Sequence, residues 1–217
     1  MTSGITVVAM AGESDSRLLV LHGLRLKGFA EAADVAELVG LDPKAVTEEL
    51  ERLKGGELVL YREGRLTGWA LTPAGRKAQE SALRDEIEAC GARDAVFDAY
   101  KRFLDLNTDL LQICTSWQMK DEVTINDHSD ASYDAAVIDQ LHALHDKVEP
   151  IITDLEQILD RYCGYRGRLQ SSLDKLRAGE NEWFTKPLID SYHTVWFQLH
   201  EDLLNTLGIE RSQEGAH

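Results

Sequence analysis

The stretch Gly64–Arg76, GRLTGWALTPAGR, decides the fold, because a strand pattern in it gives way directly to a helix start. Leu66–Leu71, LTGWAL, is typical of a short strand. Thr72 is a favoured N-cap residue, and Pro73 is favoured at the first position of a helix. The segment therefore predicts a strand that runs straight into a capped helix.

The residues before this strand predict the other half of a β-hairpin. After Gly55-Gly56 the period of the apolar side chains changes to two, and Glu57–Arg62, ELVLYR, is typical of a short strand. Glu63-Gly64-Arg65 suits a tight turn, because glycine accepts a positive φ. We expect Glu57–Arg62 to pair with Leu66–Leu71.

Three short amphipathic helices are predicted upstream of the hairpin. They are Ser16–Lys27, Phe29–Val39 and Pro43–Lys54. Gly40 ends the second helix, and Asp42 and Pro43 are a favoured N-cap and first residue for the third. Two helices joined by a short turn make a helix-turn-helix unit. The order of three helices, a hairpin and a capped helix predicts a winged helix-turn-helix.

Residues ~15–90 resemble the winged helix-turn-helix of MarR-type bacterial transcription regulators. The resemblance rests on the helix pair VAELVGLDPKAVTEELERLKGGELV, the wing YREGRLTGWAL and above all LTPAGRKAQ. It covers about a third of the chain. It implies a dimeric repressor or activator whose recognition helix enters the major groove of operator DNA and whose wing touches the minor groove. Small ligands often release such proteins from DNA.

The expected DNA contacts lie on the recognition helix, Pro43–Lys54, and on the wing. They are Lys44, Thr47, Arg52, Arg62 and Arg65. Glu48, Glu49 and Glu51 on the same helix argue the other way, since carboxylates repel phosphates. The alternative is a winged helix that serves only as a protein-interaction or dimerisation module.

Composition narrows the classes of function. The formal net charge is −15, and most of the acidic excess lies in the second half of the chain. This argues against a nonspecific binder of nucleic acid or anionic membranes, but not against a repressor with a local basic patch. No apolar run approaches the ~18–20 residues that would span a bilayer. The N-terminus is a poor signal peptide, so we expect a cytoplasmic protein.

The second half predicts an antiparallel helical bundle. The expected helical stretches are Asp94–Trp117, Asp134–Cys163, Arg166–Arg177 and Trp183–Leu207. Pro150 falls within the second stretch and predicts a kink or break just before it. The fold class is therefore mostly α, with a DNA-binding winged helix-turn-helix in residues 1–90. Residues 91–217 would form a helical domain for dimerisation that could also hold an effector.

Aromatic and histidine side chains of the second half are candidates for an effector pocket. They are Trp117, His128, Trp183, His193, Trp196, Phe197 and His200. In this hypothesis the tryptophans stack on a ligand while His193 and His200 orient it. The alternative is ordinary core and dimer packing, which aromatic residues supply routinely.

No signature of an enzyme or a metal site stands out. The chain has no P-loop, GxGxxG or GxSxG motif, and its three cysteines have no CxxC spacing. His142 and His145 could face His193 or His200 across the bundle, but their spacing is not that of a metal motif. We therefore expect no catalytic residues, metal or cofactor.

Together these features predict a cytoplasmic, ligand-responsive transcription regulator that binds operator DNA as a homodimer. The alternative, favoured by the acidic recognition helix, is an accessory or adaptor subunit that does not bind DNA and uses its winged helix to contact another protein.

Overall fold

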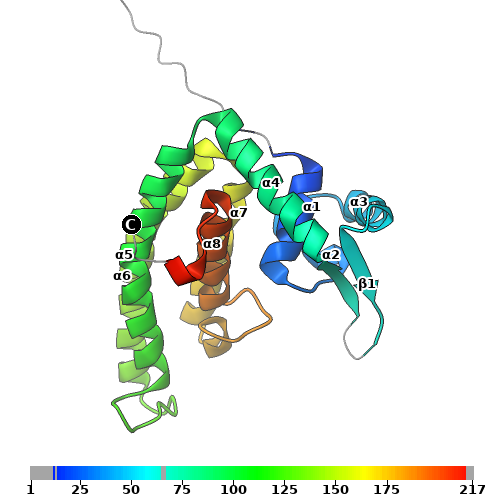
Figure 1. Cartoon of the computed structure of the whole chain (residues 1–217). Coiled ribbons are helices and arrows are strands. Elements are labelled where there is room, and N and C mark those ends of the chain that lie inside the picture. Colours follow the sequence, from blue (N-terminus) through cyan, green and yellow to red (C-terminus); the bar gives the residue numbers. More distant parts are fainter. Residues whose placement is uncertain (1–11, 13, 65–66, 214–217) are drawn as a thin grey trace, which may run out of the picture.

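The computed structural model describes residues 12, 14–64 and 67–213, and it confirms the predicted fold class. Three helices precede a two-stranded antiparallel hairpin, and further helices follow (Figure 1). The elements are α1 (Ser16–Lys27), α2 (Ala32–Val39), α3 (Pro43–Gly55), β1 (Val59–Arg62), β2 (Gly68–Leu71), α4 (Pro73–Cys90), α5 (Arg93–Gln118), α6 (Ala131–Ile158), α7 (Cys163–Arg177) and α8 (Tyr192–Leu207), with the 3₁₀ turns η1 (Asp160–Tyr162), η2 (Asn181–Trp183) and η3 (Arg211–Gln213).

Local sequence signals set the turn between α2 and α3. Gly40 ends α2 in the left-handed region, with φ at 68°, where glycine has no steric penalty. The Asp42 carboxylate then accepts hydrogen bonds from the backbone N–H groups of Lys44 and Ala45, both at 3.0 Å. These bonds satisfy donors that a helix start leaves free. The helix-turn-helix predicted from Gly40, Asp42 and Pro43 is thus present.

The hairpin runs straight into α4, as the sequence predicts. Thr72 accepts a hydrogen bond from the backbone N–H of Gly75 at 3.0 Å, and its hydroxyl donates to the Glu57 carbonyl at 2.8 Å. One side chain therefore caps α4 and also fastens it to the start of the hairpin. Gly75 is needed there, because a Cβ at this position would lie 1.9 Å from the carbonyl oxygen of Leu58.

The second half forms a helical bundle. The long helices α5 and α6 lie side by side, and α7 and α8 pack beside them (Figure 1). Trp196, Tyr192, Phe103 and Tyr162 are among its largest fully buried side chains. Helices α1 and α4 contact α8, so the winged helix-turn-helix is packed against the bundle. No helix in the described ranges is long and apolar enough to cross a membrane.

Several predicted boundaries are wrong. The sequence predicts a kink or break just before Pro150, and the break is absent, because α6 continues through this residue. Pro150 is exposed, so water can satisfy the backbone carbonyl that its missing N–H leaves free. The last helix begins at Tyr192 rather than Trp183, because Ser191 caps it by accepting from the Thr194 N–H. Trp183 belongs to the separate turn η2.

The remaining differences lie at other helix ends. The first turn expected for α2 is extended instead, because the Ala30 backbone pairs with Trp69 of β2. The stretch expected as one helix to Cys163 ends at Ile158, and α7 begins at Cys163.

Candidate functional sites

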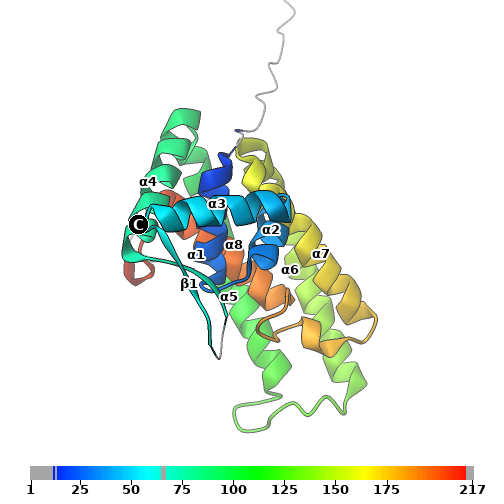
Figure 2. The ribbon, with the colours of Figure 1, turned by 90° about the vertical axis from the view of Figure 1, so that its right-hand side faces the viewer.

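Helix α3 presents one exposed face, which is the candidate nucleic-acid interface. Val46, Leu50 and Leu53 are buried against α1 and α2, whereas Lys44 and Thr47 are exposed at the start of the helix. Figure 2 shows α3 across the front of the molecule, with the hairpin projecting beside it. The predicted contacts on α3 therefore face solvent beside the wing.

The acidic residues of α3 are largely neutralised within the helix. Arg52 is 2.5 Å from Glu49, and Lys54 is 3.6 Å from Glu51. Glu48 is exposed and forms no ion pair with any residue that the structure describes. Two of the three carboxylates thus lie beside a cation, so that about one negative charge on this helix remains to repel phosphates. One of these cations is Arg52, which is itself a predicted DNA contact.

Of the two predicted DNA contacts on the wing, the structure describes Arg62. Arg62 is exposed at the end of β1, where it pairs in register with Gly68. Arg65 lies outside the described residues. Lys54 at the end of α3 lies over the ring of Trp69, with its Nζ 5.5 Å from the ring centroid. This contact links the end of α3 to β2.

The predicted effector residues lie in several separate parts of the structure. Trp117 lies against His128, with ring centroids 4.5 Å apart, where the α5–α6 loop meets α5. Trp196 and His200 instead pack on Phe103 inside the bundle, at 4.6 and 5.5 Å.

The other three predicted effector residues lie elsewhere. Phe197 is exposed under the Arg211 guanidinium, which lies 4.6 Å from its ring centroid. His193 is half-buried at the start of α8. Trp183 of η2 lies beside Lys175 of α7, and both line a hollow between the winged helix-turn-helix and the bundle.

His128 is held in an unusual backbone conformation by buried polar neighbours. Its φ is 59°, a region that non-glycine residues seldom adopt. The side chain of buried Asn126 accepts from the His128 backbone N–H at 3.1 Å and donates to Asp134 at 2.7 Å. Nδ1 of His128 lies 3.0 Å from Asp134. These bonds hold the imidazole by one nitrogen at the tip of the α5–α6 hairpin.

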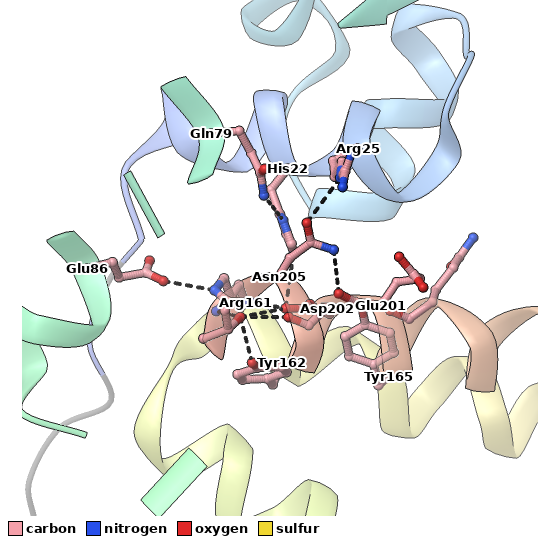
Figure 3. A network of polar contacts seen from close by, with 12 residues as sticks. His22, Arg25, Gln79, Glu86, Arg161, Tyr162, Tyr165, Glu201, Asp202 and Asn205 are labelled. Carbon is pink, nitrogen blue, oxygen red and sulfur yellow. Dashed lines mark hydrogen bonds and ion pairs between the residues drawn. The ribbon is translucent and has the colours of Figure 1, made fainter. Parts of the chain in front are cut away.

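A buried polar network joins the winged helix-turn-helix to the bundle (Figure 3). Arg161 of η1 donates to Glu86 of α4 at 2.9 Å and also pairs with Asp202 of α8. His22 of α1 lies with Nε2 3.1 Å from Asp202 and with Nδ1 3.0 Å from Gln79 of α4. The Arg161 and Asp202 side chains are only 1% and 2% exposed. Arg161 and Asp202 both belong to the bundle, so the contacts that cross to the winged helix-turn-helix are those of Glu86 with Arg161 and of His22 with Asp202.

The network also fixes the ionisation of its members. Burial opposes the charge on Asp202, but Arg161 and His22 hold the pKa of its carboxyl below the ordinary value. Tyr165 donates a hydrogen bond to Asp202 at 2.9 Å, and burial raises the pKa of this phenol well above its usual range. Sequence reasoning missed the network, because nothing local links positions so far apart along the chain.

The bundle histidines have ordinary partners. Burial lowers the pKa of His145, whose Nδ1 lies 3.3 Å from the Tyr192 hydroxyl. His142 lies beside Arg177 on α7. Across residues 12, 14–64 and 67–213, no group of three or more His, Cys, Asp or Glu side chains is arranged to hold a metal ion.

Comparisons with known proteins find partial relatives. The chain is 37% identical over 62 residues to the HTH-type transcriptional regulator MntR of Geobacillus kaustophilus, and 36% identical over 62 residues to that of Geobacillus thermodenitrificans. Each alignment covers 28% of this chain and 43% of the relative, so the chain matches less than half the length of these proteins. No family model and no solved structure matches the chain. These matches support a helix-turn-helix transcription regulator and do not confirm the MarR type.

Proposed function

We propose that this protein is a DNA-binding transcription regulator. The observation that carries the proposal is the exposed face of α3 beside the hairpin wing, in a winged helix-turn-helix that resembles named transcriptional regulators. In such folds the recognition helix reads base edges in the major groove, and its N-terminal residues reach deepest. Lys44 and Thr47 hold that position here. Arg52, Arg62 and Arg65 would add contacts to phosphates and the minor groove.

Dimerisation and ligand response belong to the same proposal. Operators are usually palindromic, with half-sites about one DNA turn (~34–36 Å) apart, so two copies of the winged helix-turn-helix would bind one operator. Residues 91–217 would hold the two copies at that spacing, in the cytoplasm. A bound small molecule would change the spacing by favouring one arrangement of the two domains over another.

The adaptor function remains the second candidate. Glu48 on the exposed face of α3 and the net charge of −15 both favour a protein partner over DNA. Neutralisation of Glu49 and Glu51 by their helical neighbours weakens this argument. The two candidates differ in what the α3 face contacts, which mutation can decide.

The test compares Lys44→Ala, Arg62→Ala and the control Lys101→Ala. Lys101 is an exposed lysine of α5, far from α3, that pairs with Asp98. DNA fragments are first selected from a random pool with the full chain, and affinities are then measured by fluorescence anisotropy. We expect Lys44→Ala and Arg62→Ala each to weaken binding about tenfold (~1–3 kcal/mol per contact), whereas Lys101→Ala leaves it unchanged. Equal affinities for all three variants would exclude the α3–wing face as the DNA contact.

A further inference from the structure

A groove runs between the winged helix-turn-helix and the bundle. It consists of two adjoining hollows, of about 330 and 440 Å³, which share Glu37 and Leu38 of α2 and Arg168 of α7. Together they have the size of pockets that bind small molecules (~300–1,000 Å³). The predicted effector residues, apart from Trp183, do not line these hollows.

The smaller hollow has an apolar wall and a polar floor. Leu19, Leu26, Leu38 and Val39 line it from the winged-helix side. His22 lies at its floor, only 3% exposed, with Nε2 3.1 Å from Asp202. The floor of this hollow is thus formed by the buried network. An apolar side chain would fit against the four aliphatic residues.

The larger hollow carries charges of both signs that no ion pair neutralises. Lys27 at the end of α1 and Glu37 on α2 form no ion pair with any described residue, and Lys175 on the opposite wall lies over the ring of Trp183. In contrast, Arg168 is paired with Asp190 at 2.7 Å. A ligand with one negative and one positive group would complement this end of the groove.

Helix α7 is hollowed where it faces the groove. Gly164 and Gly167 line the smaller and the larger hollow, and a Cβ at either position would meet no atom within 4 Å. Glycine inside a helix costs ~1 kcal/mol relative to alanine. Packing in the described structure does not demand glycine at these positions. The two glycines leave the α7 wall of the groove open.

We propose that this groove binds an α-amino acid with an apolar side chain. The carboxylate lies between Lys27 and Lys175, the ammonium group pairs with Glu37, and the side chain enters the smaller hollow. An apolar acid would place no cation at Glu37, and an apolar amine would place no anion at the two lysines. The ligand would touch α1 and α2 on one side and α7 on the other, so it would fix the orientation of α3. This regulatory role rests on the proposed function, whereas binding itself does not.

The test measures binding to the full chain in the absence of DNA. Isothermal titration calorimetry compares L-leucine and L-phenylalanine with 3-methylbutylamine and 4-methylpentanoate, which each lack one charged group of leucine. We expect at least one amino acid to bind, and to bind at least tenfold more tightly than the amine and the acid. Failure of both amino acids to bind, or equal binding of either fragment, would overturn the proposal.

Variants then place the ligand in the groove. Gly164→Leu fills the smaller hollow and should weaken binding at least tenfold, whereas the control Ala136→Leu, on the exposed face of α6, should not change it. Glu37→Gln and Lys27→Met should each weaken binding about threefold to fivefold, as expected for partly exposed charges. Circular dichroism confirms that each variant is folded. Unchanged affinity of folded Gly164→Leu would exclude this groove.

A separate titration of DNA, with and without the bound amino acid, keeps the two proposals apart. An amino acid that binds a chain with no affinity for DNA leaves the groove assignment intact and overturns the proposed function. DNA binding by a chain that binds neither amino acid leaves the proposed function intact and overturns the groove assignment. A change of at least threefold in DNA affinity on saturation with the amino acid would support the regulatory role, and an unchanged affinity would overturn it.

Discussion

Replacing Asp202 by asparagine tests how much the buried network contributes to the stability of the fold. The substitution keeps the shape of the side chain but removes its charge, so the Arg161 guanidinium would retain only Glu86 as an anionic partner. Breaking a buried ion pair on one side costs ~3–5 kcal/mol. Because Glu86 remains, we expect the lower end, a loss of about 3 kcal/mol in the free energy of unfolding. This corresponds to a factor of about 100 in the ratio of folded to unfolded protein.

The assay is urea unfolding followed by circular dichroism and tryptophan fluorescence. The matched control is Asp154→Asn, which removes an exposed pair with Arg102 in which both side chains are about half exposed. Exposed pairs contribute ~0–1 kcal/mol, so the control should unfold close to the wild type. A loss of less than about 1 kcal/mol for Asp202→Asn would refute the reasoning, because such a value is typical of a surface pair.

The pH dependence of the free energy of unfolding tests the role of the Asp202 charge independently. The pKa of Asp202 is lowered in the folded state from its ordinary value of 3.8, so its charge stabilises the fold above that pH. This stabilisation is lost as the pH falls below 3.8 toward the folded-state pKa. The difference in stability between wild type and Asp202→Asn should therefore shrink as the pH falls below about 4. An unchanged difference at pH 3 would contradict the assignment.

Three further predictions concern the hairpin junction and the thiols. Gly75→Ala should destabilise the protein by about 1–3 kcal/mol in thermal unfolding, because the new Cβ would overlap the Leu58 carbonyl. The control Gly164→Ala has open space around it and should be neutral or stabilising. Equal effects of the two substitutions would refute the packing argument. Thr72→Ala should cost about 0.5–2 kcal/mol through the lost N-cap, and a stability within error of the wild type would show that the cap is dispensable. Burial raises the pKa of the Cys114 thiol to about 11, so a thiol reagent at pH 8 should label Cys114 only on unfolding. The reagent should label exposed Cys90 first and Cys163 more slowly, because burial and nearby carboxylates raise the pKa of Cys163. Rapid labelling of all three thiols would contradict the burial of Cys114.

The sequence predicted the winged helix-turn-helix closely because its signals are local. Asp42 and Thr72 cap helices within three residues, and Gly40 ends a helix by its own conformational freedom. Each signal acts over one turn of chain, so a single sequence displays it. The exposed position of Lys44 and Thr47 followed from the helical period alone.

The interior of the second half could not be predicted in the same way. Aromatic residues such as Trp117 and Trp196 lie on different helices, and the packing of those helices, rather than the sequence spacing, decides which of them meet. The network of His22, Arg161 and Asp202 depends on contacts across most of the chain. Whether the predicted effector residues bind a ligand remains a prediction.

The most direct test of the proposed function is the affinity for the DNA upstream of the protein's own gene, compared with scrambled DNA of the same composition. Fluorescence anisotropy at several salt concentrations would separate sequence-specific binding from binding to phosphates alone. A transcription regulator should prefer its operator by ~10³-fold or more at physiological salt. Equal affinity for both DNAs, or no binding even at low salt, would contradict the account and favour a protein partner for the α3 face.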